Sequence, residues 1–151
     1  MIAIGSDHAG YELKEKIKEY LNDNDINYID FGTNSTDSCD YPDFAKEVSK
    51  YVSQNENSQG ILVCGSGIGV SIVANKTKNV RAALCYSSEC AELSRKHNNA
   101  NVLCLGARFI DFEIAKEIIE SFLNTDFEGG RHLNRVNKIK AIESVNFKEE
   151  F

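Results

Sequence analysis

Residues 60–69 read GILVCGSGIG and join an apolar run to a glycine-rich loop. The run from Gly60 to Cys64 is continuous rather than alternating, which is typical of a strand buried on both faces of a sheet. The glycines that follow let a backbone approach a ligand and adopt positive φ. A short helix is predicted to open at Val70, and the amides of a helix start favour an anion. The stretch therefore predicts a strand, a ligand-binding loop and a helix.

The same alternation extends outward along the chain. Four more apolar runs, at residues 1–5, 27–31, 80–85 and 102–105, are also continuous or nearly so, and they too predict strands buried on both faces. Helical periodicity separates them, at residues 13–21, 44–52, 87–96 and from 111 onward. A last helix is predicted from about His132, with its inward face formed by Val136, Ile139, Ile142 and Val145. Strands alternating with helices predict an α/β fold with a parallel sheet and helices on both faces.

Length and charge limit the classes of protein. A chain of 151 residues suits one domain, which we expect over residues 1–151 with a tail from about residue 146. The formal net charge of -6 disfavours binding to nucleic acid or to an anionic membrane surface. No apolar stretch approaches the roughly 20 residues that span a bilayer. An apolar strand-like run follows Met1 directly, so we expect no signal peptide and a cytoplasmic location.

Cysteine and histidine usage gives no framework for a disulfide or a metal. The five cysteines are widely spaced without any C-x-x-C, so we expect reduced thiols that are mostly buried and inert, at positions 39, 64, 85, 90 and 104. The three histidines are scattered along the chain without framing carboxylates. We therefore expect no metal site and no cofactor.

Cys64 is the exception among these thiols, because it stands at the entrance of the glycine loop. A helix N-terminus favours a thiolate, which could act as a nucleophile or as a general base. A C-x5-R phosphatase loop would need an arginine at position 70, which is valine. The loop also lacks the G-x-G-x-x-G and Walker A patterns. We prefer a base, and a tight turn without a function remains the alternative.

Polar residues follow the first strand and end one of the helices. Asp7 and His8 would face the Cys64 loop if the first and third strands are neighbours, although Asp7 could simply cap the next helix. His97-Asn98 ends a helix, where a histidine often only complements the helix dipole.

Two arginines open the last helix. Arg131 and Arg135 are four apart and therefore share one face. The positive end of a helix dipole disfavours cations there, which suggests a phosphate clamp. Ion pairing with the acidic surplus of the chain is the alternative.

These stretches resemble the ribose/galactose/allose phosphate isomerase family, and within it the type B ribose-5-phosphate isomerases. The resemblance covers nearly the whole chain in order, through GSDHAG (5–10), DFGT (30–33), DYPDFA (40–45), ILVCGSGIGVSIVANK (61–76), RAALC (81–85), LSRKHNNANVLCLGAR (93–108) and FEGGRHLNRV (127–136). It implies a Rossmann-like, three-layer α/β/α sandwich with a five-stranded parallel sheet. It also implies a homodimer or a dimer of dimers with active sites at the interface.

The family reaction implies a role for each matching residue. Ribose 5-phosphate and ribulose 5-phosphate interconvert through a cis-enediolate, with Cys64 as the base and Ser66 moving a hydroxyl proton. Some members use a glutamate slightly further on, but residues 71–75 hold no carboxylate. His97 would open the furanose ring with help from Asp7. The remaining substrate-binding residues would be Gly65, Gly67, Ile68 and Gly69 at the enediolate, His8, Arg131 and Arg135 at the phosphate, and Asn98 and Arg108 completing the pocket.

The resemblance leaves other functions open. Galactose-6-phosphate isomerase subunits typically lack a histidine at the position of His97, so its presence favours a ribose-type substrate. Allose 6-phosphate is a further possible substrate, since it needs only a slightly longer pocket. The alternative to an enzyme is a non-catalytic phosphate-binding module, in which Cys64 would be an ordinary buried thiol. By the same resemblance, His97, Asn98 and Arg108 would come from the neighbouring subunit.

Overall fold

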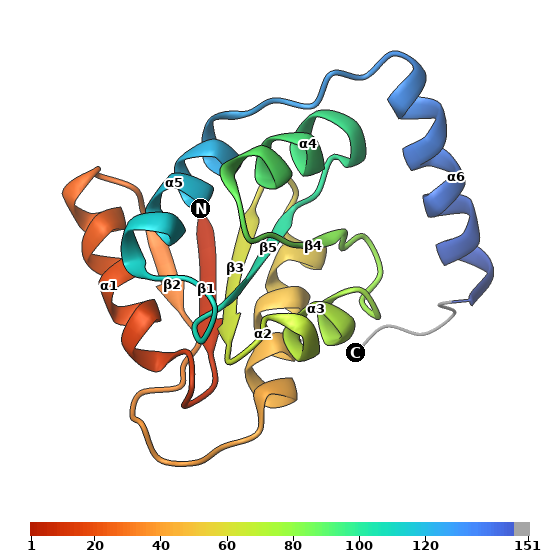
Figure 1. Cartoon of the computed structure of the whole chain (residues 1–151). Coiled ribbons are helices and arrows are strands. Elements are labelled where there is room, and N and C mark those ends of the chain that lie inside the picture. Colours follow the sequence, from red (N-terminus) through yellow and green to blue (C-terminus); the bar gives the residue numbers. More distant parts are fainter. Residues whose placement is uncertain (147–151) are drawn as a thin grey trace.

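The computed structural model describes residues 1–146, which fold around one five-stranded parallel sheet (Figure 1). The sheet has the order β2-β1-β3-β5-β4, and its strands are β1 (Ile2–Ser6), β2 (Tyr28–Asp30), β3 (Gln59–Cys64), β4 (Ala82–Leu84) and β5 (Val102–Gly106). In the register, Leu62 of β3 lies opposite Gly5 of β1 and Cys104 of β5. The five predicted strands and their parallel pairing are confirmed.

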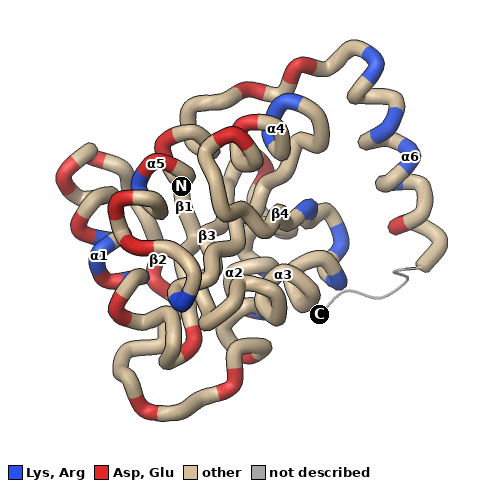
Figure 2. Tube along the Cα trace, in the orientation of Figure 1, with Lys and Arg blue, Asp and Glu red and all other residues tan. Residues whose placement is uncertain are grey.

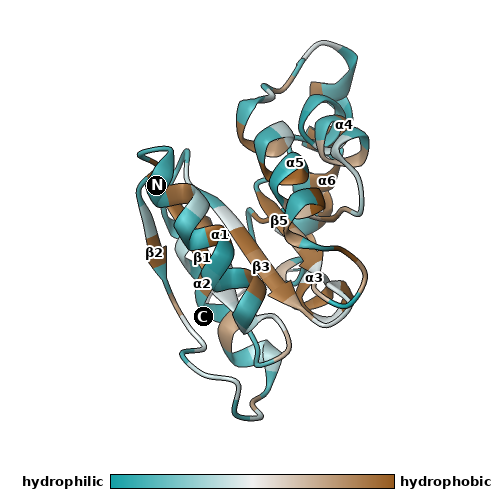
Figure 3. Cartoon of the chain, turned by 60° about the vertical axis from the view of Figure 1, so that its left-hand side comes forward, coloured by the Kyte–Doolittle hydropathy of each residue, from teal (hydrophilic) through white to brown (hydrophobic). Residues whose placement is uncertain are grey.

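Helices cover both faces of this sheet. One face carries α1 (Tyr11–Asp23), α4 (Ser88–Asn98) and α5 (Phe112–Asn124), and the other carries α2 (Tyr41–Gln54) and α3 (Ile68–Ala74). Figure 3 shows the apolar residues gathered along the central strands and polar residues on the outer sides of α1 and α2. The three-layer α/β/α sandwich is confirmed.

The prediction that every strand is buried on both faces is wrong at the edges of the sheet. Strands β1, β3 and β5 are almost wholly buried, but β2 and β4 are only partly buried. An edge strand has a neighbour on one side only, so its side chains are covered less completely. The strand β4 is also shorter than the predicted run of residues 80–85.

The last helix, α6 (Arg131–Asn146), does not bury the predicted apolar face. Of the four residues on that face, Val136 alone is buried, whereas Ile139, Ile142 and Val145 are 42%, 62% and 67% exposed. The helix packs mainly against α4 and runs beyond the sheet (Figure 1). Ile139 and Ile142 instead line an open pocket of about 430 Å³ beside β4. The spacing of apolar residues shows which of them share one side of a helix, but it does not show whether another part of the protein covers that side.

The described part of the chain ends with helix α6. Asn146, where the tail was predicted to begin, closes α6, and residues 147–151 lie outside the described residues. Over residues 1–146, no helix combines the length and the apolar character that a membrane span requires.

Candidate active site

The strand order brings two loops together at the carboxyl edge of the sheet. Strand β1 pairs with β3 up to Ser6 and Val63, and the Asp7 amide then donates a hydrogen bond to the Val63 carbonyl at 3.3 Å. The chain leaves β1 toward α1 on one face and leaves β3 toward α3 on the other. Ligands of such sheets bind in the crevice where neighbouring connections part. Asp7 and the Cys64 loop are therefore neighbours, as predicted.

The Cys64 sulfur accepts a hydrogen bond from a backbone amide of its own loop. Gly67 N–H donates to Cys64 Sγ over 3.1 Å, and the Cys64 residue is 4% exposed. The amide places a partial positive charge against the sulfur. The next amide, of Ile68, donates instead to Ser66 Oγ at 3.1 Å. The loop thus directs one amide at the thiol and another at the serine hydroxyl.

The glycines of the loop are required by close packing. Gly67 has φ of +78°, and a Cβ there would lie 2.5 Å from the Leu84 side chain and 2.9 Å from the Leu105 carbonyl carbon. A Cβ on Gly69 would lie 2.5 Å from the Tyr41 ring. These contacts hold the loop against β4, β5 and α2 and fix the direction of its amides.

Ser66 is fixed through its backbone as well as its side chain. The Tyr86 hydroxyl donates to the Ser66 carbonyl at 2.6 Å. The Ser66 backbone also packs on Gly106, where a Cβ would approach the Ser66 carbonyl oxygen to 2.4 Å. Sequence reasoning missed Tyr86, because it follows β4 in a region without a recognisable loop motif.

Asp7 and His8 have different environments. Asp7 is buried, and its Oδ1 accepts a hydrogen bond from the Gly10 amide at 3.0 Å, in the turn before α1. The N-cap residue of α1 is Gly10, and no side chain caps it, so Asp7 does not cap this helix. His8 Nδ1 accepts the Cys39 amide at 3.2 Å. Because Nδ1 is an acceptor, the ring proton of neutral His8 lies on Nε2, which can donate to a ligand. Cys39, a further missed residue, also brings its sulfur to 3.9 Å from His8 Nδ1.

Arg108 lies beside the loop of its own chain. Its backbone amide donates to the Gly65 carbonyl at 3.0 Å, and its guanidinium would lie 3.1 Å from a Cβ on Gly65. This position differs from the expectation that Arg108 reaches the site from a neighbouring subunit. The glycine is what allows the planar guanidinium to lie so close to the loop.

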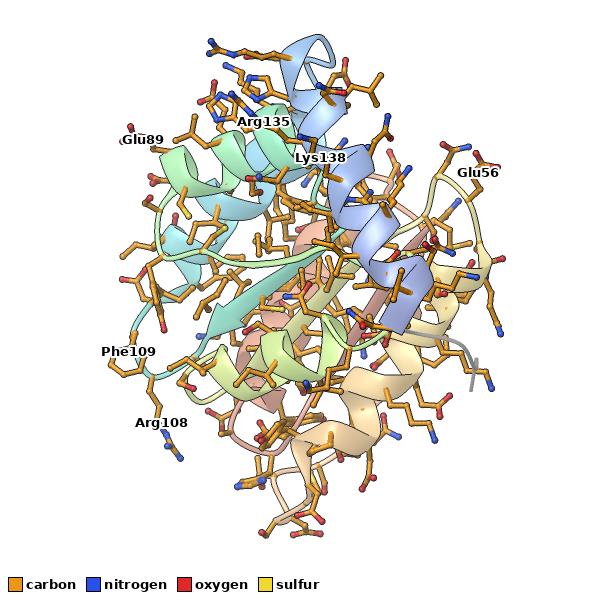
Figure 4. The ribbon with its side chains drawn as sticks, turned by 90° about the vertical axis from the view of Figure 1, so that its right-hand side faces the viewer. Glu56, Glu89, Arg108, Phe109, Arg135 and Lys138 are labelled. Carbon is orange, nitrogen blue, oxygen red and sulfur yellow. The ribbon has the colours of Figure 1, made fainter. Side chains whose placement is uncertain are left out.

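The other predicted site residues form a second cluster at the opposite end of the molecule. His97 and Asn98 end α4, just before the amino end of β5, whereas Cys64 lies at the carboxyl edge. Arg131 and Arg135 are exposed at the start of α6. Figure 4 shows Arg108 and Arg135 far apart, in the lower and upper parts of the view. One chain alone does not bring the predicted residues together.

The prediction that the histidines are scattered is wrong for two of the three. The His97 and His132 rings stack, with centroids 4.3 Å apart and planes 14° apart. Glu128 Oε2 lies 3.5 Å from His132 Nε2. Burial, together with His97 and Arg131, lowers the pKa of His132. Helices α4 and α6 lie far apart in sequence, which is why the spacing of the residues gave no indication of this cluster.

The remaining cysteines behave largely as expected. All five are free, and Cys85 and Cys104 are buried. Burial, with the neighbouring Cys90, raises the pKa of Cys85 to about 12. Burial likewise raises the pKa of Cys104, so these two thiols stay protonated at neutral pH. Cys90 is exposed and Cys39 is only partly covered, so three of the five cysteines are buried, which agrees with the expectation that most of them are.

Comparison with known proteins identifies relatives over nearly the full length. Residues 2–139 match the family described as Ribose/Galactose Isomerase. Ribose-5-phosphate isomerase B of Escherichia coli (strain K12) is 45% identical over 142 residues, covering 94% of this chain and 95% of the relative.

Solved structures agree with this assignment. Ribose-5-phosphate isomerase B of Clostridium thermocellum superposes with a TM-score of 0.93 at 46% identity, over 95% of this chain and 97% of that one. The Mycoplasma genitalium enzyme, solved with bound ribulose-5-phosphate, has a TM-score of 0.92 at 47% identity, over 95% of each chain. Sequence and fold agree along the same residues, and the chain therefore belongs to the ribose/galactose isomerase family.

Proposed function

We propose that this protein is a type B ribose-5-phosphate isomerase that interconverts ribose 5-phosphate and ribulose 5-phosphate. The observation that carries the proposal is the hydrogen bond from the Gly67 amide to Cys64 Sγ, at the carboxyl edge of the sheet where β1 and β3 end side by side. The ribose-5-phosphate isomerase B relatives, one of them with bound ribulose-5-phosphate, support this choice of substrate. The reaction belongs to the non-oxidative pentose phosphate pathway, in the cytoplasm.

In the proposed chemistry, Cys64 removes the proton from C2 of the open-chain sugar and returns it to C1. Negative charge develops on the enediolate oxygens during this transfer, and the amides of residues 65–69 are fixed before it appears. One such preorganised donor is typically worth about 3 kcal/mol. Ser66 Oγ, held by the Ile68 amide, moves the hydroxyl proton between O1 and O2. No metal ion takes part in these steps.

The other groups open the ring and hold the substrate. His97 transfers the proton that opens the furanose, with Asp7 at the ring oxygens. His8 donates from Nε2 to the phosphate, and Arg131 and Arg135 clamp it from the start of α6. The phosphate does not react, so these contacts position C2 against the sulfur. Asn98 and Arg108 complete the pocket.

The separation of the two clusters supports a homodimer. A twofold axis that places the α4 end of one subunit over the Cys64 loop of its partner builds two equivalent sites. Each site then takes Cys64, Asp7, His8 and Arg108 from one subunit, and its other residues, Asn98 included, from the partner. The exposed Ile139 and Ile142 on α6 supply apolar surface for the same contact. Two such dimers could pair further into a dimer of dimers.

The decisive experiment mixes purified protein with ribose 5-phosphate and follows ribulose 5-phosphate, with and without EDTA. We expect turnover that the chelator does not change and that is almost lost in Cys64→Ala. Cys104→Ala is the matched control, because Cys104 is a buried thiol on the neighbouring strand β5. Turnover that survives in Cys64→Ala would remove Cys64 as the base. Turnover of allose or galactose 6-phosphate alone would change the substrate, and no turnover of any aldose phosphate would favour a binding module.

A further inference from the structure

The stacked histidines belong to a compact cluster of three metal-ligating side chains. His97 ends α4, His132 lies in the first turn of α6, and Glu128 lies on the segment that joins α5 to α6. One ligand atom from each of these residues lies within 4.8 Å of the other two. Two imidazoles and one carboxylate are the ligand set of many catalytic zinc sites, which leave a fourth position for water.

The backbone brings the carboxylate to the two rings. The Glu128 amide donates to the Lys96 carbonyl at 3.2 Å, which ties the connecting segment to the end of α4. The His132 amide donates to the Gly129 carbonyl at 3.0 Å, which closes the turn into α6. His132 is buried, His97 is partly buried, and the Glu128 side chain is 49% exposed. The cluster is therefore held from three segments and is open to solvent on the Glu128 side.

The surrounding charges restrict which ion can bind. Lys96 lies near Glu128, and Arg131 and Arg135 lie near His132, so the field at the cluster opposes a cation. A hard ion such as Mg²⁺ prefers oxygen ligands and has only one carboxylate here. Zn²⁺ binds imidazole nitrogen strongly and can bind despite the unfavourable field. Tetrahedral ligand atoms lie about 3.4 Å apart for bonds of about 2.1 Å. Because the two rings stack with planes 14° apart, one imidazole has to turn out of the stack before both rings point a nitrogen at the same ion.

We propose that His97, Glu128 and His132 form a Zn²⁺ site and that zinc bound there inhibits the protein. The inhibition rests on the proposed function, because the ion occupies a nitrogen of His97, whose imidazole the ring-opening step requires. The binding itself does not depend on that function. Zinc at this site is an inhibitor and not a cofactor of the isomerisation.

Binding is tested by titrating Zn²⁺ into the protein in a calorimeter, in the Cys64→Ala background so that this thiol does not contribute. We expect one site per chain, at least about tenfold weaker affinity in Glu128→Gln, and no binding of Mg²⁺. Glu117→Gln on α5 is the control for a lost exposed carboxylate. Co²⁺ in place of Zn²⁺ should give the visible spectrum of a four-coordinate site without sulfur-to-metal charge transfer. Equal affinity in Glu128→Gln and Glu117→Gln, or a charge-transfer band, would overturn the site.

Inhibition is tested separately on the Cys64-containing protein. Zn²⁺ should lower the turnover of ribose 5-phosphate reversibly, and Glu128→Gln should need at least about tenfold more zinc for the same effect. Equal zinc sensitivity in Glu128→Gln would overturn the inhibitory role even if the calorimetric site exists. Absence of turnover without zinc would contradict the proposed function, while the calorimetry would still decide the metal site.

Discussion

Lys14 Nζ lies 2.7 Å from both carboxylate oxygens of Asp30, in a place where the Lys14 side chain is wholly buried. Asp30 also accepts a hydrogen bond from Lys18 Nζ at 2.8 Å and another from the Gly32 amide at 2.8 Å. Burial raises the pKa of Asp30, but the hydrogen bonds from Lys14, Lys18 and Gly32 outweigh it and hold the pKa below its usual value. Figure 2 shows both acidic and basic residues along α1. The folded state thus favours ionised Asp30.

The lowered pKa of Asp30 predicts acid sensitivity. Its stabilising contribution is fully present above the unfolded pKa of about 3.9 and is lost as the pH falls through the folded pKa. Asp30→Asn should therefore flatten the dependence of unfolding free energy on pH below about 5. At neutral pH it should cost about 3–5 kcal/mol, because the buried Lys14 loses its close partner and keeps only Glu15 Oε2, 3.9 Å away. Urea midpoints across this pH range measure both effects.

The exposed Asp23 at the end of α1 provides the control. Asp23→Asn should leave both the urea midpoint and its pH dependence close to those of the unchanged protein. A steep acid loss that persists in Asp30→Asn would assign the sensitivity to other carboxylates.

Gly67→Ala should damage both stability and turnover. Positive φ costs a residue with a Cβ about 1–2 kcal/mol, and here the Cβ also collides with Leu84 and with β5. We expect a total loss of about 2–5 kcal/mol, since overpacking adds about 1–3 kcal/mol to the cost of the positive φ. Gly129→Ala shares the positive φ, at +69°, but has nothing within 4 Å of its Cβ. Equal urea midpoints for the two variants would show that the packing of the loop is not restrictive.

Tyr86→Phe should lower kcat and leave KM nearly unchanged. The Tyr86 hydroxyl donates a hydrogen bond to the Ser66 carbonyl and is not among the groups proposed to bind the phosphate, so KM should not depend on it. Its loss loosens the loop that holds Ser66 during proton transfer. A neutral hydrogen bond worth about 0.5–1.5 kcal/mol corresponds to roughly two- to tenfold in kcat. Tyr51→Phe on α2 is the control for a lost phenol hydroxyl. A raised KM with constant kcat, or a shifted urea midpoint that accounts for the loss, would argue against positioning of Ser66.

The residues predicted correctly from sequence are those whose structure is local or dictated by the sheet. A continuous apolar run followed by glycines specifies a buried strand and a loop, and parallel strands bring the ends of β1 and β3 to one edge. The contact between His97 and His132 is different, because it depends on how α6 packs on α4 across a long connection. The exposure of Ile139 is missed for the same reason, since periodicity does not identify the covering surface.

Complementation between two inactive variants tests whether the active sites are shared. Cys64→Ala and His97→Asn should each lose almost all turnover of ribose 5-phosphate. When they are refolded together in equal amounts, half of the dimers are mixed, and each mixed dimer has one site with Cys64 and His97 both intact. Turnover should therefore return to about a quarter of the unchanged protein, as twofold symmetry with shared sites requires. If each site were instead built within one chain, turnover would not recover, because no chain in the mixture carries both Cys64 and His97. Refolding Cys64→Ala with Asp7→Asn is the matched control: both changes fall on the same half of the site, so this pair should stay inactive.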